Sequence, residues 1–346
     1  MTAAIRWHRP LLVLAAAMGL LAVACLVGMI VDPRQLLGVG IWEKPLKFAL
    51  STVIYAVTWS WLIGQLQRFQ RVAWWAGTLS AVLLLVELII ITGAAAAGIT
   101  SHFNVSTAFS TVLWSIMAGS IGTLWVATFV VSVVLFRNPL GDHARSFAIR
   151  SGAVIALVGM ALAFLMTGPT SEQLSNWQGI AGAHAVGIAD GGPGVPILGW
   201  STVAGDLRIP HFIGMHALQV IPLVLMGLER ASRRIAVLRR ESVRWALMVV
   251  VAAVYSAVLA MVTWQALRGQ SIVRPDAVTL VLSASIVLAA LCAAAIIIAR
   301  GLRSLEVERL AHLEGEELAA ASDRDGLDAS ASHVAADDGE HRLVHR

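Results

Sequence analysis

Charged residues are scarce in this 346-residue chain, where Asp, Glu, Lys and Arg together make up 13%. Soluble domains carry about 25% charged residues. Hydrophobic residues here reach 58%, with a mean hydropathy of +0.78. This composition excludes an ordinary soluble enzyme. Cysteine is scarce as well, since Cys25 and Cys292 both lie in apolar runs. A disulfide framework and a cysteine-rich metal site are therefore excluded.

Short motifs of catalysis and recognition are also missing. The sequence has neither a Gly-x-Ser-x-Gly nucleophile elbow nor a His-Glu-x-x-His zinc motif. It has no haem attachment motif, and its basic residues form no aromatic-interleaved patch of the kind that binds nucleic acid. No nucleic-acid partner is expected, and whether the chain is an enzyme stays open.

Long apolar runs are abundant, and a span of the bilayer takes about 20 residues. The runs predict an all-α, polytopic transmembrane bundle of about eight spans. The expected spans cover residues 11–31, 46–66, 72–92, 110–136, 148–167, 210–228, 245–267 and 277–299.

The Lys and Arg residues of the connections fall unevenly on the two sides that eight spans define. One side holds 15 of them and the other holds 6. Because cytoplasmic connections carry the excess of Lys and Arg, both termini are predicted to be cytoplasmic. Arg outnumbers Lys by 23 to 2, as in proteins of GC-rich bacteria. These features predict a multi-pass protein of the bacterial cytoplasmic (inner) membrane, with the lipid bilayer as a partner.

The charge balance changes near the end of the last apolar run. Residues 1–299 hold 19 basic and 10 acidic side chains, whereas residues 300–346 hold 6 basic and 11 acidic ones. We therefore predict a transmembrane bundle over 1–299 and a cytoplasmic tail over 300–346. The tail is expected to begin with a short amphipathic helix over 301–318 and to lack regular structure from Ala319 onward. A cytoplasmic partner could bind it.

The stretch from Gly205 to Pro222 crosses from a connection into an apolar helix and is unusually polar. It carries Asp206, Arg208, His211, His216 and Gln219. Polar groups held at membrane depth are expensive and mark functional sites by default. His211 and His216 are five residues apart and do not share a helix face. His216 and Gln219 are three apart and do.

Glu87 is the only carboxylate well inside a predicted span. A buried carboxylate needs a partner or a proton. Helix rise places Glu87 at about the same depth as His216. We therefore expect the two to pair or to line one outward-facing polar pocket. The alternative is a hydrogen bond between helices with no further role.

Both lysines of the chain, Lys44 and Lys47, lie in the segment Trp42–Phe48 at the start of the second span. They could face an anionic group. They could instead be interfacial anchors beside Trp42, whose side chain suits the aromatic belt of a membrane protein.

Two further histidines lie in connections on the same predicted outer side. His102 follows the third span in a connection that contains no Lys or Arg. His184 lies in the long connection from Gly168 to Ile209, and connections of that length often act as lids or binding loops. In that connection, Thr170 and Gln173 match a capping box, which predicts a short helix through about Val186. His102 could carry a proton or ligate a metal or haem, or it could be satisfied by the local backbone.

Three segments together resemble a group of uncharacterised bacterial multi-pass membrane proteins. They are Gly205–Pro222, Trp42–Phe48 and Ser101–Asn104, about a tenth of the chain. The resemblance implies the membrane location and the protein class, and it carries no assigned activity.

The leading functional hypothesis is an outward-facing, histidine-containing polar pocket that binds a small ligand, a transition metal or haem, in a redox role. Histidines on separate segments can ligate haem iron or a metal ion. The candidate ligands are His102, His184, His211 and His216.

Two alternatives remain open. One is a proton-coupled transporter or permease of a small anionic solute, with a relay through Glu87, His216 and Gln219. In that case Lys44, Lys47 and Arg208, with Asp206 beside it, would lie at the entrance. The other is a non-catalytic scaffold or sensor, whose Arg-rich connection over 230–244 and acidic tail would meet a cytoplasmic partner.

Overall fold

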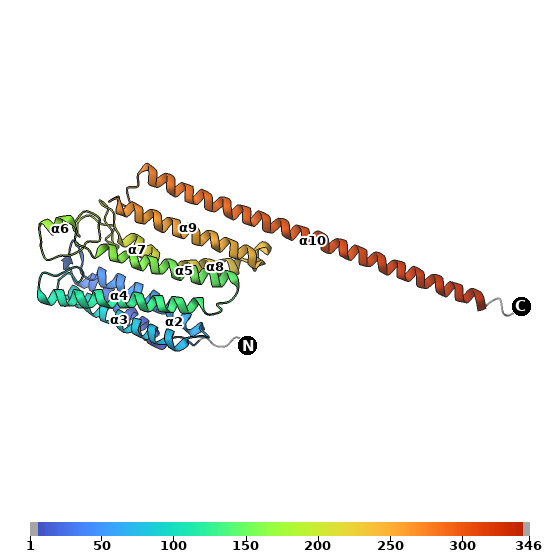
Figure 1. The fold of residues 1–346 in the computed structure, drawn as a ribbon, viewed down its shortest axis with the longest axis horizontal. Helices are drawn as coiled ribbons and strands as arrows, with labels where there is room; N and C mark the ends of the chain where they lie inside the picture. Colours follow the sequence, from blue (N-terminus) through green and yellow to red (C-terminus); the bar gives the residue numbers. More distant parts are fainter. Residues whose placement is uncertain (1–5, 342–346) are drawn as a thin grey trace.

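The computed structural model describes residues 6–341, with side chains through residue 317, and forms an elongated bundle of helices from which one long helix projects (Figure 1). The longer helices are α1 (Arg9–Val31), α2 (Glu43–Gln65), α3 (Gln70–Ala96), α4 (Ala108–Phe136), α5 (His143–Ala161), α7 (Arg208–Met215), α8 (Ala217–Ala231), α9 (Glu241–Leu267) and α10 (Ala277–His341). The short elements are the strands β1 (Gln35–Leu36) and β2 (Val39–Gly40), the 3₁₀ helices η1 (Leu162–Met166) and η2 (Ala236–Arg239), and α6 (Ser171–Ser175).

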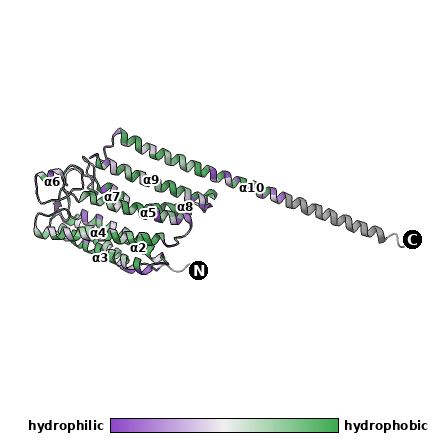
Figure 2. Cartoon of the chain, in the orientation of Figure 1, coloured by the Kyte–Doolittle hydropathy of each residue, from purple (hydrophilic) through white to green (hydrophobic). Residues whose placement is uncertain are grey.

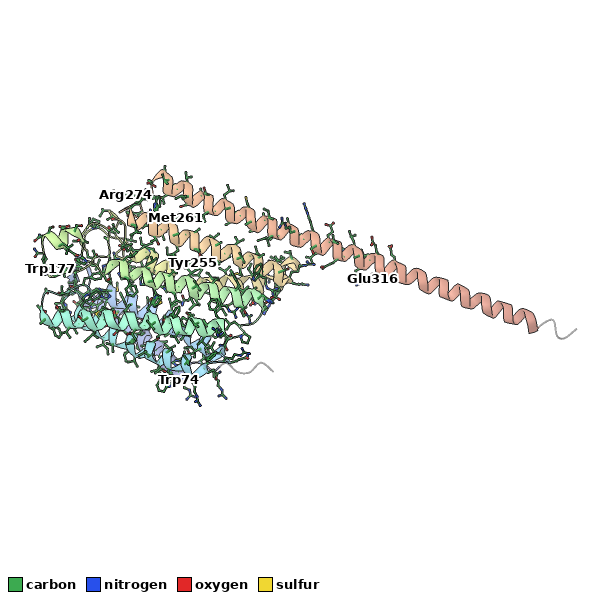
Figure 3. All side chains as sticks on the ribbon, viewed as in Figure 1. Trp74, Trp177, Tyr255, Met261, Arg274 and Glu316 are labelled. Atoms are coloured by element: carbon green, nitrogen blue, oxygen red, sulfur yellow. The ribbon has the colours of Figure 1, made fainter. Side chains whose placement is uncertain are left out.

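Seven helices in the described part of the chain are long and apolar enough to span a membrane, and α7 with α8 would make an eighth, bent span. The prediction of a mostly helical chain with about eight apolar helices of span length is confirmed at that level, and this is compatible with a multi-pass membrane protein. Hydrophobic residues line the bundle helices and the first part of α10 (Figure 2). Trp74 and Trp177 lie at opposite ends of the bundle (Figure 3), as expected for aromatic residues at two interfaces.

The bundle packs around two hydrophobic clusters. The first joins α1 to α4, with fully buried residues such as Leu62 and Leu88. The second joins α5, α8 and α9, with Ile221 and Met248 fully buried. Helix α5 contributes side chains to both clusters, so it holds the two groups of helices together.

The connections gather at two ends of the bundle. We call one the loop end, made by residues 32–42, 97–107, 167–207 and 268–276. The other, the Arg-rich end, holds the start of α1 and the connections between α2 and α3, α4 and α5, and α8 and α9. Helix α10 begins at the loop end and runs past the Arg-rich end (Figure 1). The sequence also predicted that successive connections lie alternately at the two ends of the bundle.

The span predicted over 210–228 is not one straight helix. Helices α7 and α8 meet at His216 with a bend of 46°. The backbone C=O of Ile213 accepts a hydrogen bond of 2.5 Å from the Tyr255 hydroxyl on α9, in place of a bond within the helix. Pro222 also lacks the N–H that would bond the carbonyl four residues earlier. Because the hydrogen bond that compensates this bend comes from Tyr255 on another helix, the bend could not be predicted from the local sequence.

Helices α5 and α7 touch backbone to backbone at Gly159 and Gly214. A Cβ atom on Gly159 would lie 2.2 Å from the carbonyl carbon of Gly214, and one on Gly214 would lie 2.4 Å from the Cα of Gly159. No side chain can be accommodated at either position unless the helices separate. This contact fixes the start of α7 against α5, and with it the end of the long 167–207 connection.

We expect Gly214→Val to destabilise the fold by about 3 kcal/mol, the upper part of the usual overpacking range, because backbone atoms cannot move aside as a flexible side chain could. The measurement is the thermal unfolding midpoint of the purified protein in detergent. Gly122→Ala on α4 is the matched control. No atom lies within 4 Å of a Cβ there, so this substitution should be neutral or slightly stabilising. Equal melting of the two variants would contradict the close approach of α5 and α7.

The last helix differs from the predicted tail. Helix α10 continues through Arg300 to His341 without a break, so the amphipathic stretch over 301–318 extends the last apolar helix. Near the Arg-rich end, Arg240 forms an ion pair with Glu308 of α10. The stretch from Ala319, predicted to lack regular structure, is drawn within α10, and its side chains lie outside the described residues. The division into bundle and tail, and the tail's partner, stay predictions.

Candidate functional site

At the loop end, the 97–107 connection pairs with the 167–207 connection, which also pairs with itself. Asn104 pairs with Ile180, and Ala185 pairs with Asp206, as isolated antiparallel bridges. The predicted capping box of Thr170 and Gln173 is present. The helix that it opens ends at Ser175 instead of continuing to Val186, because the following residues leave the helix to bond the 97–107 connection. The connections therefore fold down onto the bundle.

Asp206 anchors this layer. Its side chain is completely buried and accepts hydrogen bonds from the Ser201 backbone N–H at 2.8 Å and from the Arg208 Nε at 2.9 Å. A second guanidinium nitrogen of Arg208 bonds the other carboxylate oxygen at 2.5 Å and the Gly199 carbonyl at 2.6 Å. The prediction placed Asp206 and Arg208 at an entrance, and the structure places them in the scaffold of the connection.

Lys47 belongs to the same scaffold. Its ammonium donates a hydrogen bond of 3.1 Å to the Leu198 carbonyl, next to the Gly199 carbonyl that Arg208 holds. Two cations thus fix two successive carbonyl groups of one turn. The two lysines of the chain, three residues apart in sequence, have different surroundings.

Lys44 instead meets His102 and Glu87 under the loops. The Lys44 ammonium lies 3.1 Å from His102 Nδ1, and His102 Nε2 lies 3.8 Å from Glu87 Oε1. An ammonium group can only donate hydrogen bonds, so Nδ1 must accept and the ring proton lies on Nε2, facing Glu87. The second carboxylate oxygen of Glu87 has no hydrogen-bond partner in the described part of the chain. We call these three residues the Lys44–His102–Glu87 cluster.

His184 lies against this cluster and is held by Asp190. The backbone N–H of His184 donates to Asp190 Oδ1 at 2.9 Å, and Nδ1 of the ring bonds Oδ2 at 2.5 Å. The rings of His184 and His102 are 6.4 Å apart between centroids, and Phe103 packs against both. Because Nδ1 donates to the carboxylate, Nε2 is the ring nitrogen left to accept a proton or a hydrogen bond.

A cavity of about 210 Å³ opens above these groups. Lys44, His102, His184 and Asp190 line it from the bundle side, and the amide side chains of Gln173, Asn176 and Gln178 line it from the α6 segment. The volume suits a small molecule below the range of about 300–1,000 Å³ usual for drug-sized ligands. Asp190 is a lining residue that the sequence prediction missed.

Burial sets the protonation of the two loop histidines. The pKa of His102 lies well below its ordinary value because the ring is desolvated, and the positive Lys44 nearby adds to the effect. Burial also lowers the pKa of His184, although Asp190 opposes that shift. Both rings are therefore neutral at pH 7.

These shifts predict that stability falls as the pH drops below about 6.5. The unfolded chain then binds protons that the folded chain does not, which costs about 1.4 kcal/mol per pH unit for each such histidine until its folded-state pKa is reached. The thermal midpoint, measured from pH 7.5 to pH 5, should fall more steeply for the natural protein than for His102→Gln. Identical slopes would show that His102 does not take part.

The remaining predicted site residues lie elsewhere. His211 Nδ1 bonds the Gly159 carbonyl at 2.8 Å, at the contact between α7 and α5. Gln219 donates to Thr58 on α2 at 3.2 Å, and His216 packs on Phe212. The expected pairing of Glu87 with His216 is wrong, because His102 occupies that position.

A metal site gains no support from these positions. In the described ranges, no three His, Cys, Asp or Glu side chains lie close enough together to hold a metal ion. His211 is engaged by a backbone carbonyl, and one nitrogen of His102 faces a lysine. The metal site therefore stays a prediction. Haem binding stays a prediction without a structural argument.

Lys44, Glu87, His102 and His184 come from four different segments of the chain, and all of them except Glu87 line the cavity. Their arrangement could bind an anion at Lys44 and pass a proton between a loop and the bundle interior. No protein-family model, no curated protein and no solved structure matches this chain.

Proposed function

We propose that the loop-end cavity binds a small anionic solute at Lys44 and that the Lys44–His102–Glu87 cluster couples this binding to proton uptake, in a proton-coupled permease. The observation that carries the proposal is a row of contacts in space: the Lys44 ammonium contacts the His102 ring, and that ring faces the Glu87 carboxylate. Lys44 lines the cavity, and Glu87 lies buried in α3.

The cavity is lined by one lysine, Lys44, and by two carboxylates, Asp190 and the exposed Glu172 on α6. Both oxygens of Asp190 are engaged by His184. Lys44, by contrast, contacts the neutral ring of His102. A carboxylate or phosphate group can therefore pair with Lys44 without displacing an existing ion pair. Charge-assisted hydrogen bonds of this kind are roughly twice as strong as neutral ones.

Proton coupling follows from the same geometry. An anion that pairs with Lys44 removes the positive charge that compensates a negative Glu87. An unpaired carboxylate buried in a bilayer is costly, so the occupied cavity favours protonated Glu87. His102 supplies a ring between the cavity and Glu87, and its Nε2 must move closer than the present 3.8 Å to Glu87 Oε1 for a proton to pass.

The Arg excess at the opposite end supports an orientation in which the loop end faces away from the cytoplasm. In that orientation the cavity receives solute from outside a bacterial cytoplasmic membrane. This placement and the topology of the termini belong to the proposal.

Uptake of anions into proteoliposomes tests the proposed proton-coupled transport. With an imposed gradient, alkaline inside, radiolabelled phosphate or succinate should accumulate in vesicles that contain the protein. A protonophore should abolish the accumulation. Uptake no greater than in protein-free vesicles for these anions, or uptake that ignores the gradient, would overturn coupled transport.

A further inference from the structure

A second group of polar side chains lies where Gln219, just after the bend between α7 and α8, meets Thr58 of α2. We call it the α2/α8 polar seam, made by Thr58, His216 and Gln219. Gln219 Nε2 donates to the Thr58 hydroxyl at 3.2 Å, and Thr58 in turn donates to the Ile54 carbonyl at 2.8 Å. His216 lies at the bend and packs edge-on against Phe212, with ring centroids 4.4 Å apart. The seam shares no residue with the loop-end cavity.

Two atoms of the seam are buried without a hydrogen-bond partner in the described structure. They are Nε2 of His216 and Oε1 of Gln219. The bond to Thr58 fixes the orientation of the Gln219 amide and leaves its oxygen free. His216 and Gln219 lie three residues apart, so their side chains share a face and approach each other, but without the geometry of a hydrogen bond. Unsatisfied polar atoms in an apolar span cost free energy, and a ligand that bonded both would recover it.

The surroundings of the seam are apolar and open to the membrane. Ile54, one turn before Thr58, is 42% exposed, and Leu223, one turn after Gln219, is 60% exposed. Phe212 is 42% exposed and packs edge-on near Trp200. All of these lie on apolar helices or beside them. A ligand would therefore reach the seam from the lipid phase.

We propose that the α2/α8 polar seam binds the hydroxyl group of a lipophilic molecule, such as a long-chain alcohol or a quinol. Gln219 Oε1 can only accept, so the ligand must donate a hydrogen. His216 Nε2 can donate in one tautomer, so the same group must also accept. A hydroxyl does both at once. Carbonyl and ester groups cannot donate and meet only one of the two atoms, and Phe212 offers a surface for a ring or chain next to the hydroxyl.

Photolabelling of the full-length protein in nanodiscs tests this site. The probe is hexadecanol with a diazirine beside its hydroxyl end, and tryptic peptides are mapped by mass spectrometry. The proposal predicts labelling within residues 209–230. Labelling should fall about tenfold in His216→Phe and in Gln219→Leu, the scale expected when a hydrogen bond is lost in an apolar setting.

Competitors and controls decide the outcome. Excess hexadecanol should displace the probe, whereas methyl palmitate, which has no hydroxyl, should not. If decylhydroquinone displaces the probe at lower concentration than hexadecanol, the ligand is of the quinol kind, and the reverse order indicates an aliphatic alcohol. His102→Gln should label like the natural protein, and each variant should elute as a monodisperse peak. Equal labelling of all variants, or equal displacement by methyl palmitate, would overturn the proposal.

Discussion

Asp206→Ala should lower the free energy of unfolding by about 3–5 kcal/mol, the usual cost of removing one partner of a buried ion pair. The side chain of Asp206 is completely buried, while that of Arg208 is 30% exposed. The substitution would leave the Arg208 guanidinium and the Ser201 N–H without their acceptor. The 194–206 segment should then detach from the bundle. Thermal unfolding, with limited proteolysis to detect cleavage in this segment, measures the effect.

Glu229→Ala is the matched control for this prediction. Glu229 pairs with Arg145 at 2.9 Å at the Arg-rich end, where both side chains are partly exposed. Such pairs contribute about 0–1 kcal/mol, so the thermal midpoint should hardly change. If Asp206→Ala melts like Glu229→Ala, then Asp206 does not anchor the loop end.

Lys44→Met should weaken anion binding about ten- to one-hundredfold. Hydrogen bonds to charged groups contribute about 1.5–3 kcal/mol, and each 1.4 kcal/mol is a factor of ten in affinity. Methionine keeps most of the side-chain length and removes the charge beside His102. Isothermal titration calorimetry with phosphate and succinate gives the affinity of the natural protein and the variant.

Lys47→Met is the matched control for Lys44→Met, because it removes a positive charge that lies near the cavity but does not line it. Lys47 bonds the Leu198 carbonyl and does not line the cavity. This variant should lose some stability and keep its anion affinity within about threefold, since the Lys47 ammonium is held by the Leu198 carbonyl outside the cavity lining. Equal losses of affinity in the two variants would contradict a site centred on Lys44.

The positions of most long helices could be predicted from the sequence. Runs such as 11–31 and 245–267 are long, apolar and bounded by charge, and the structure has helices there. The bend at His216 was not predictable in the same way. It depends on the close contact of Gly159 with Gly214 and on a hydrogen bond from Tyr255, and both are tertiary contacts.

The partner of Glu87 shows a second limit. Helix rise compares the depth of Glu87 with that of His216 along the helix axes and says nothing of lateral position. His102 was expected in a surface connection, yet the 97–107 segment bonds residues 179–181 and folds down so that His102 faces Glu87. Asp190 was missed because it follows His184 by six residues in a glycine-rich loop, where no periodic pattern indicates which side chains meet.

The number of protons taken up when an anion binds tests the central claim most directly. Calorimetric titration in two buffers with different ionisation enthalpies gives that number for the natural protein and for Glu87→Gln. Net proton uptake on anion binding is expected for the natural protein, larger at pH 8 than at pH 7, because more Glu87 is ionised before the anion binds at the higher pH. Near zero is expected for Glu87→Gln, whose neutral amide should still permit binding at Lys44. Binding with the same proton count in both proteins would contradict the assignment of Glu87 as the coupled group.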